Sequence, residues 1–244
     1  KPADAYARPV RRAVLTSAKP KIALVIGGLG LNARRTRDAI EMLPGVVTLA
    51  FAPYGKRLQG LINAARANGH EVLLELPMEP WGYPSVNPGP KTLLVSAGAK
   101  NIPSMRWLMA RAAGYVGLIN YAGQRFLANG EALAPVLHEA KRRGLVFIDN
   151  GRVPQSLLAN LAAVIGLPAA TAQVHIDAVA KREAIRAKLK ELVALAERRG
   201  HAIGVGAAFD ATVEELEYWI DAMRASGRVQ FVPVSAIFKL QGRG

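Results

Sequence analysis

The sequence contains no cysteine, which excludes three kinds of site at once. Without sulfhydryl groups the chain cannot form disulfide bonds, hold a metal through thiolates or use a cysteine nucleophile. Histidine is scarce too: there are four, and their positions show no metal-binding spacing. Because cysteine-free chains occur in both the cytosol and the periplasm, this absence does not decide the compartment.

Long hydrophobic runs are also missing. No apolar stretch approaches the roughly 18 residues of a membrane-spanning helix, so we expect no transmembrane segment. No signal peptide is present, and the sequence starts at Lys1 rather than at Met. We therefore expect that an upstream segment has been removed.

Acidic residues are few compared with basic ones. The 18 Asp and Glu residues face 32 Lys and Arg residues, which gives a net charge of +14. This excess favours an acidic partner such as nucleic acid, anionic lipid or an anionic cell-wall polymer. The basic residues are spread over the first 21 residues, over helix surfaces and over Arg-Arg pairs that precede glycine, where a helix dipole favours cations. We therefore interpret most of them as solvated faces and predict no nucleic-acid partner.

The segment 21–30 is the best-defined element of the sequence. Five apolar residues, Ile22 to Ile26, lie between Lys21 and Gly27, which is typical of a parallel strand covered on both faces. Sites in α/β folds are built at the carboxyl ends of such strands, and here Gly27 and Gly28 offer no side chain for chemistry. The glycines do not form the G-x-G-x-x-G fingerprint either, which disfavours dinucleotide binding.

Strand-like and helix-like segments alternate about seven times with short connections. This order predicts an α/β fold with a parallel sheet, and the length favours a closed or nearly closed (β/α) barrel over an open doubly wound sheet. We assign residues 1–20 to an N-terminal arm or linker and 21–240 to a single barrel domain. The expected strands are 21–26, 46–51, 71–76, 115–119, 145–148, 173–176, 201–206 and 229–234. The expected helices are 32–43, 56–68, 101–112, 130–143, 154–165, 180–199 and 211–226.

Residues just past the expected strands are the candidates for a site. Asp149 could be a base or the partner of an arginine, and Glu79 could contact substrate or only brace its loop. Glu75 is expected to pair with Arg125, and Asp177 to cap a helix. Four aromatic side chains could stack on sugar rings or fill the edge of the core: Tyr54, Trp81, Tyr83 and Tyr121.

Several segments together resemble the divergent polysaccharide deacetylase family, relatives of the NodB-type carbohydrate esterases. The resemblance covers roughly residues 21–238 in order, and the block around Gly69 to Pro80 is its most specific part. The matching segments are IALVIGGLGLN (22–32), VTLAFAPY (47–54), ARANGHEVLLELPMEP (65–80), PGPKTLL (88–94), NYAGQRF (120–126), RGLVFIDN (143–150) and VPVS (232–235).

This resemblance implies a distorted (β/α)7–8 barrel of the NodB type. It also implies export, a periplasmic or envelope-associated location, and a polymer of N-acetylated amino sugars as substrate. In active relatives a divalent metal would polarise the acetamide carbonyl and activate a water, with carboxylates as acid and base.

The sequence departs from the family pattern where the metal would be held. Gly27 and Gly28 stand where active members carry an Asp-Asp pair. Tyr121 stands where they carry a histidine, and Ala207 where a Gly-His-Pro motif places another. A hard divalent ion needs several oxygen or imidazole ligands, so we expect no metal cofactor.

Two functional hypotheses follow from the resemblance. The first is a hydrolase of carbon–nitrogen amide bonds with a remodelled site, whose catalytic residues would be Asp149 and Glu79. The second is a non-catalytic protein, a pseudoenzyme, that binds or scaffolds envelope polysaccharide or peptidoglycan fragments. For both we expect a cleft lined by Tyr121, Arg125, Asp149 and Glu79. The candidate substrate-binding residues are Gly27, Gly28, Tyr54, Glu75, Met78, Trp81, Asn120, Tyr121, Arg125 and Asn150.

Overall fold

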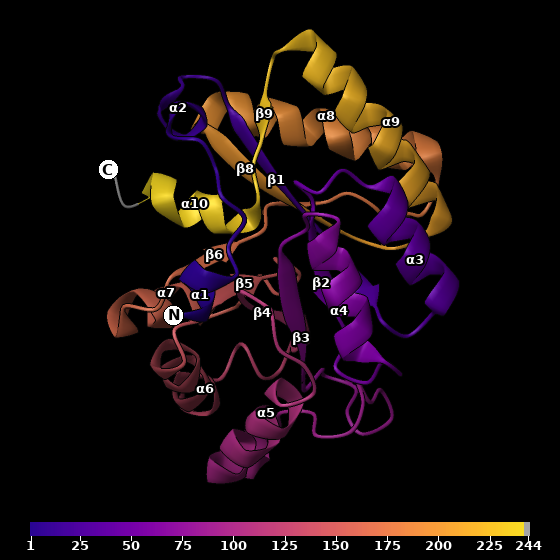
Figure 1. Ribbon diagram of the computed structural model, residues 1–244. Coiled ribbons are helices and arrows are strands. Elements are labelled where there is room, and N and C mark those ends of the chain that lie inside the picture. The colour runs from indigo at the N-terminus through magenta and orange to yellow at the C-terminus, as the bar shows by residue number, and fades with distance from the viewer. Residues whose placement is uncertain (242–244) are drawn as a thin grey trace.

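A curled parallel sheet forms the centre of the molecule (Figure 1). The computed structural model describes residues 1–241. The hydrogen-bonded order is β6-β5-β4-β3-β2-β1-β8-β7, with β9 paired to the start of β1, and every ladder is parallel. The strands are β1 (Lys21–Leu29), β2 (Thr48–Phe51), β3 (Val72–Met78), β4 (Gly117–Ala122), β5 (Val146–Asp149), β6 (Ala169–Thr171), β7 (Val174–His175), β8 (His201–Ala207) and β9 (Gln230–Phe231). The predicted distorted barrel of the NodB type is confirmed.

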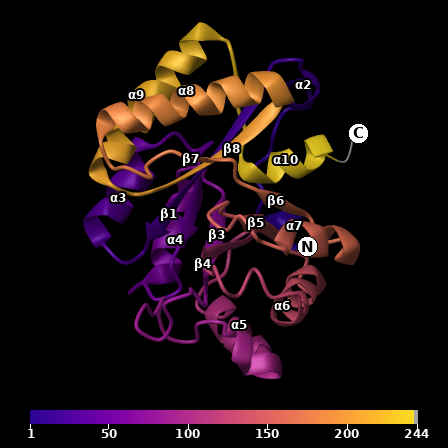
Figure 2. The ribbon, with the colours of Figure 1, turned by 180° about the vertical axis from the view of Figure 1, so that it is seen from behind.

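Helices cover the outside of this sheet, as Figures 1 and 2 show from opposite sides. They are α3 (Ala33–Met42), α4 (Leu58–Ala67), α5 (Asn101–Met109), α6 (Gly130–Arg142), α7 (Leu158–Ile165), α8 (Arg182–Arg199) and α9 (Asp210–Ser226). The 3-10 helix η1 (Val95–Lys100) precedes α5, and α10 (Val234–Gln241) follows β9. Among the helices in residues 1–241, none has the length and apolar character that crossing a membrane requires.

The alternation of side chains along β1 explains why the sheet has two cores. Successive residues of a strand point to opposite faces. Ile22, Leu24 and Ile26 therefore pack outward against the helices, whereas Ala23 and Val25 belong to a separate cluster inside the barrel. The small interior residues of β1 leave room for the chain to curl. Each large side chain buried on the outer face stabilises the fold by about 1.5–3 kcal/mol relative to exposure.

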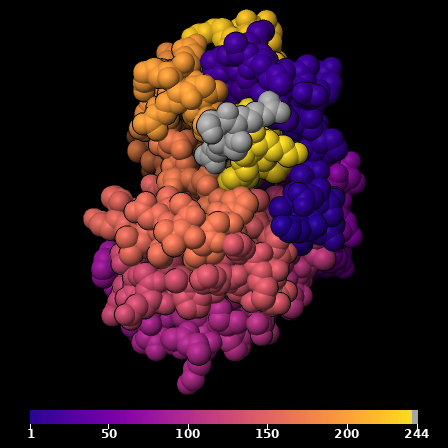
Figure 3. All heavy atoms as spheres, turned by 90° about the vertical axis from the view of Figure 1, so that its left-hand side faces the viewer, coloured from indigo at the N-terminus to yellow at the C-terminus, as the bar shows by residue number. Residues whose placement is uncertain are grey.

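The amino ends of the strands are closed by the two termini of the chain. Helices α1 (Pro2–Ala5) and α2 (Arg12–Thr16) lie in the arm, and side chains including Tyr6, Val14 and Leu15 pack against the inner cluster. Helix α10 contributes Ile237 to the same cluster. Figure 3 shows the indigo arm beside the yellow α10 on one face of the molecule. The segment assigned to an arm thus carries two helices and packs against the barrel.

A buried carboxylate joins these parts. Glu71 is inaccessible to solvent and accepts hydrogen bonds from the Arg8 backbone N–H at 2.8 Å and the Ser235 backbone N–H at 3.1 Å. The Ser235 hydroxyl donates a further bond to it. Burial raises the pKa of this carboxyl above its usual value. One side chain that precedes β3 therefore ties the arm and α10 to the sheet.

In the last third of the chain, three elements differ from the predictions: β6, β9 and α10. The last expected strand, 229–234, is reduced to β9, and the chain turns into α10 at Val234 because Pro233 has no N–H to extend a ladder. Strand β6 was missed: its three residues, Ala169–Thr171, are too few and too small to give a strand pattern.

We predict that Glu71→Gln destabilises the protein by about 1–3 kcal/mol, because the new amide N–H group would face a buried donor and leave one of them unsatisfied. Urea unfolding at neutral pH measures the change. Glu191→Gln is the matched control: Glu191 forms an exposed ion pair with Lys188 on α8, and its loss should cost less than about 0.5 kcal/mol. Equal effects of the two substitutions would contradict a joining role for Glu71.

Candidate functional site

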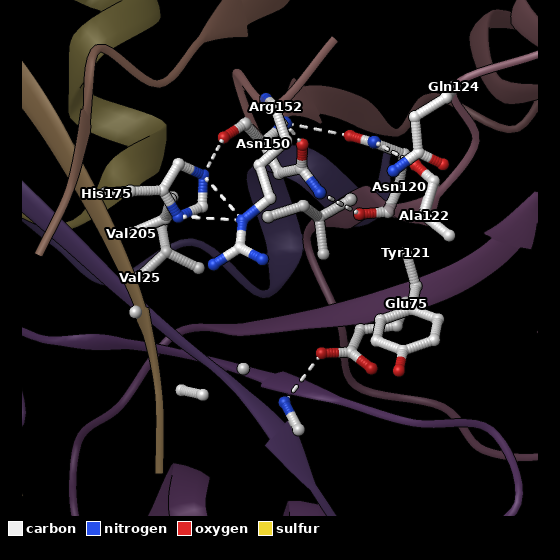
Figure 4. Close-up of a pocket in the computed structure, with 15 residues that line it drawn as sticks. Val25, Glu75, Asn120, Tyr121, Ala122, Gln124, Asn150, Arg152, His175 and Val205 are labelled. Atoms are coloured by element: carbon white, nitrogen blue, oxygen red, sulfur yellow. Dashed lines mark hydrogen bonds between the residues drawn. The ribbon is translucent and has the colours of Figure 1, made fainter. Parts of the chain in front are cut away.

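A cavity of about 280 Å³ lies at the carboxyl ends of the central strands. Figure 4 shows its residues, which come from β1, β3, β4, β7, β8 and the loops beyond β4 and β5. The lining residues are Val25, Gly27, Gly28, Glu75, Ile119, Asn120, Tyr121, Ala122, Gln124, Asn150, Arg152, His175, Val205, Gly206 and Ala207. The position is the one at which α/β barrels build their sites.

Glu75 is a buried carboxyl on β3 that contacts the glycine turn of β1. Its Oε1 accepts a hydrogen bond from the Gly28 N–H at 2.7 Å (Figure 4). A Cβ atom placed on Gly27 would lie 2.6 Å from the same oxygen. Gly28 has a φ of 74°, in the left-handed region that favours glycine. The two glycines therefore admit the Glu75 carboxyl to the cavity and hold it there.

The environment of Glu75 makes it titrate near neutral pH. Burial raises its pKa from 4.5 to about 7, and the hydrogen bond from Gly28 opposes this only in part. A carboxyl with this pKa is present in both protonation states at neutral pH, so it can either donate or accept a proton.

Two asparagines connect β4 to the loop after β5. The Asn120 side-chain oxygen accepts from the Asn150 N–H at 2.7 Å, and the Asn150 amide donates to the Asn120 carbonyl at 3.0 Å. The Asn120 amide also donates to the Ala122 carbonyl at 2.9 Å, across a turn in which Ala122 has a φ of 57°. This turn places Tyr121, whose side chain is half exposed, at the mouth of the cavity.

Arg152 is held at the cavity by the neighbouring histidine. Its Nε donates to His175 Nδ1 at 3.0 Å, and its backbone N–H donates to the Asn150 side-chain oxygen at 3.0 Å. His175 Nε2 lies 2.7 Å from the Asn150 carbonyl. Burial, together with the charge of Arg152, lowers the pKa of His175 below 6.5. The lowered pKa favours the neutral imidazole, which can accept a hydrogen bond from Arg152.

Gln124 adds an unpaired acceptor to this wall. Its Oε1 is buried and has no hydrogen-bond partner among residues 1–241. Most buried polar atoms are hydrogen-bonded, so an unpaired oxygen in a cavity wall indicates a place where a ligand can donate a hydrogen bond.

Six of the predicted site residues line the cavity: Gly27, Gly28, Glu75, Asn120, Tyr121 and Asn150. The expected cleft residues Asp149, Glu79 and Arg125 do not. Asp149 is buried and accepts from the Gly151 N–H at 2.9 Å and the Ser156 hydroxyl at 2.5 Å, so both of its oxygens stabilise the loop after β5.

The expected pairing of Arg125 with Glu75 is wrong. Arg125 Nη1 lies 2.8 Å from Glu79 Oε1, and the other Glu79 oxygen accepts from the Val95 N–H at 2.6 Å. Glu79 thus braces the long loop after β3, whereas Glu75 faces the cavity without an ion-pair partner in the described structure.

The remaining predicted binding residues lie outside the cavity lining. The Tyr54 hydroxyl donates to the Pro90 carbonyl at 2.6 Å, and burial raises its pKa to about 12. Met78 is fully buried in the outer core, and Trp81 is 68% exposed on its loop. Asp177 is no helix cap: it accepts from the Ala207 N–H at 2.6 Å and the Thr212 hydroxyl at 3.1 Å.

A model of the family described as divergent polysaccharide deacetylase matches residues 24–238. The chain belongs to the divergent polysaccharide deacetylase family. The resemblance found in the sequence is thereby confirmed.

The chain is also similar to an uncharacterized sequence and to a solved structure. The uncharacterized protein YibQ of Escherichia coli is 23% identical over 209 residues, which cover 82% of this chain and 62% of YibQ. The chain thus spans less than two thirds of the length of that relative. The crystal structure of an uncharacterized protein from Agrobacterium tumefaciens is 41% identical, with a TM-score of 0.92 over 97% of this chain and 95% of that one.

Two more distant structures share the fold. The catalytic domain of a peptidoglycan N-acetylglucosamine deacetylase from Eubacterium rectale has a TM-score of 0.52 at 13% identity, over 88% of both chains. A CE4 family pseudoenzyme from Bacillus anthracis has a TM-score of 0.53 at 10% identity, over 91% of this chain and 66% of that one.

The divergent deacetylase site of this chain does not offer the donors that a divalent metal centre needs. The positions at which the family resemblance implies ligands, Gly27, Gly28, Tyr121 and Ala207, all line the cavity. Within residues 1–241, no three His, Cys, Asp or Glu side chains are grouped so that they could hold a metal ion. The donor set therefore does not fit the metal implied by the family.

No role in the site was predicted for His175, Gln124 or Arg152, although Gln124 and Arg152 lie just past strands β4 and β5, where candidates are expected. The four histidines show no metal-binding spacing, and His175 contacts Arg152 rather than a metal. The position of His175 at the end of β7 was the available signal, since strand ends carry the site.

We predict that Glu75→Gln stabilises the protein at high pH and has little effect at low pH. A folded-state pKa raised from 4.5 to about 7 favours folding below pH 4.5, and this contribution is lost as the pH rises toward 7. A shift of this size corresponds to about 3 kcal/mol, the upper limit of the gain expected at pH 8. Urea unfolding of both proteins at pH 4.5 and pH 8 tests this; a difference that does not change with pH would contradict it.

Proposed function

We propose that this cavity binds N-acetylated amino-sugar polymers of the cell envelope without a metal and without metal-dependent deacetylation. The observation that carries the proposal is the unpaired acceptor of Gln124 in the wall of a ring-sized cavity. An acetamide N–H is a donor of the kind this oxygen lacks, and the half-exposed Tyr121 ring offers a surface on which a pyranose can stack.

Three further observations support the class of ligand and the location. Membership of the divergent polysaccharide deacetylase family favours a polysaccharide over other small molecules. The likeness to a peptidoglycan deacetylase extends this to envelope glycans. The net charge of +14 would attract an anionic envelope polymer over long range and raise its rate of association. We also propose a periplasmic or envelope-associated location after export.

A second candidate function rests on Glu75. A carboxyl with a pKa of about 7 in the cavity has the properties of a general base, which could activate a water for amide hydrolysis without a metal. In that case Glu75, and neither Asp149 nor Glu79, would be the catalytic carboxylate. Incubation with chitotetraose in the presence of a chelator, followed by mass spectrometry, separates the two functions. Binding without loss of acetyl groups supports the first, and acetyl loss that disappears in Glu75→Gln supports the second.

We predict that Gln124→Met lowers the affinity for chitotetraose about threefold to tenfold, because a hydrogen bond to the acetamide is lost. The same substitution should leave the midpoint of thermal unfolding unchanged or raise it, since it removes a buried acceptor that has no partner. Calorimetric titration and a thermal melt measure the two quantities. Lower stability with unchanged affinity would show that the Gln124 side chain is structural.

We also predict that Tyr121→Ala weakens binding of chitotetraose about threefold to tenfold through loss of the stacking surface. Tyr218→Ala is the matched control, since Tyr218 is an exposed tyrosine on α9, away from the cavity lining. A decrease of similar size in both variants would argue against binding at this cavity.

A further inference from the structure

Arg152 is a charged cavity residue for which the protein itself supplies no counterion. In residues 1–241 it takes part in none of the ion pairs, whereas Arg125, on the loop after β4, is paired with Glu79. The nearby Asp149 carboxylate is occupied by Gly151 and Ser156.

The contacts of Arg152 fix one edge of its guanidinium group and leave the other for a ligand. Nε donates to His175, and both terminal nitrogens are without a protein acceptor in the described structure. Figure 4 shows the guanidinium group pointing from the loop after β5 into the space above Glu75. Two parallel N–H donors at the end of a guanidinium group match the two oxygens of a carboxylate.

His175 and Asn150 make this orientation persistent. His175 accepts from Arg152 and lies against the Asn150 carbonyl, and Asn150 in turn accepts from the Arg152 backbone. This closed ring of hydrogen bonds restricts the side chain before a ligand arrives. Less conformational entropy is then lost on binding than for an exposed arginine side chain without such hydrogen bonds.

We propose that Arg152 is the specificity-determining residue of the cavity and that it selects amino-sugar polymers that carry a carboxylate. This inference rests on the proposed function and names its ligand more narrowly: an N-acetylated glycan that is acidic at or beside the bound sugar. The carboxylate could belong to a lactyl ether on the amino sugar or to a neighbouring uronic acid. Both sources present the same planar anion to Nη1 and Nη2.

The test compares two ligands that differ at one group, which is charged in the first and neutral in the second. The first is the peptidoglycan disaccharide of N-acetylglucosamine and N-acetylmuramic acid, and the second is the same disaccharide with its carboxylate converted to a methylamide. Calorimetric titration at 50 mM salt should show about fivefold to tenfold tighter binding of the acid. A hyaluronan tetrasaccharide carries its carboxylate on a uronic acid. If it binds more tightly than the acidic disaccharide, the uronic acid is the source of the carboxylate that Arg152 selects.

The variants locate the effect. Arg152→Gln should bind the acid and its methylamide with affinities within about twofold of each other. Arg198→Gln makes the same change of charge in the last turn of α8, outside the cavity lining, and should keep the full preference. Arg152→Lys should retain only part of it, since an ammonium group cannot make the paired contact.

The possible failures are distinguishable. Equal binding of the two disaccharides by the unaltered protein would overturn the role of Arg152 and leave the proposed function standing. A preference that persists in Arg152→Gln would assign it to another group. If neither disaccharide nor chitotetraose binds, the proposed function itself is contradicted, and this inference with it. The comparison of ligands on the unaltered protein requires no variant to fold.

Discussion

The parallel pairing of β1 with β2 on one side and β8 on the other sets the geometry of the whole molecule. This pairing runs from Lys21 to Gly27 against β8, and it brings the carboxyl ends of the central strands to one edge. The amino ends are thereby gathered at the opposite edge, where the arm and α10 cover the inner core and meet at Glu71. The site and the closure of the barrel are two consequences of one sheet orientation.

The site depends on the space that Gly27 and Gly28 leave. A side chain on Gly27 would meet the Glu75 carboxyl, and the N–H of Gly28 is the donor that positions it. The same two glycines that remove the family's expected metal ligands therefore admit a carboxyl from the neighbouring strand. Side chains from other strands and loops provide the polar groups of the cavity: Glu75, Tyr121, Gln124 and Arg152. The proposed binding function therefore relies on hydrogen bonding and charge instead of a metal.

The sequence predicted the barrel because its central strands are short apolar runs that end in glycine or polar residues. Ile22 to Ile26 and the apolar start of β3 are typical of buried parallel strands, and periodic helices separate them. Strand β6 was not predicted because Ala169–Thr171 is too short to show such an apolar run. Helix α10 was not predicted because the apolar residues around Pro233 suit a strand equally well. The hydrogen bond from Ser235 to Glu71 that accompanies the helix joins residues 164 positions apart, so no local pattern indicates it.

The candidate site was predicted in part for a similar reason. Strand ends identified Gly27, Gly28, Glu75 and Asn120, whose places follow from the register of the sheet. The ion-pair partner of Arg125 could not be predicted from strand ends or sheet register. It depends on how the loop after β3 folds back, and that loop brings Val95 to Glu79 and leaves Glu75 to the cavity.

The central claim is that an amino-sugar polymer binds in this cavity without a metal, and solution NMR tests it most directly. Backbone amide shifts would be recorded during titration with chitotetraose, once with a chelator and once with added zinc. We predict that the largest changes fall at Gly28, Tyr121, Gln124 and Gly206, and that they are the same under both conditions. Changes that require zinc, or that fall on another face of the barrel, would contradict the claim.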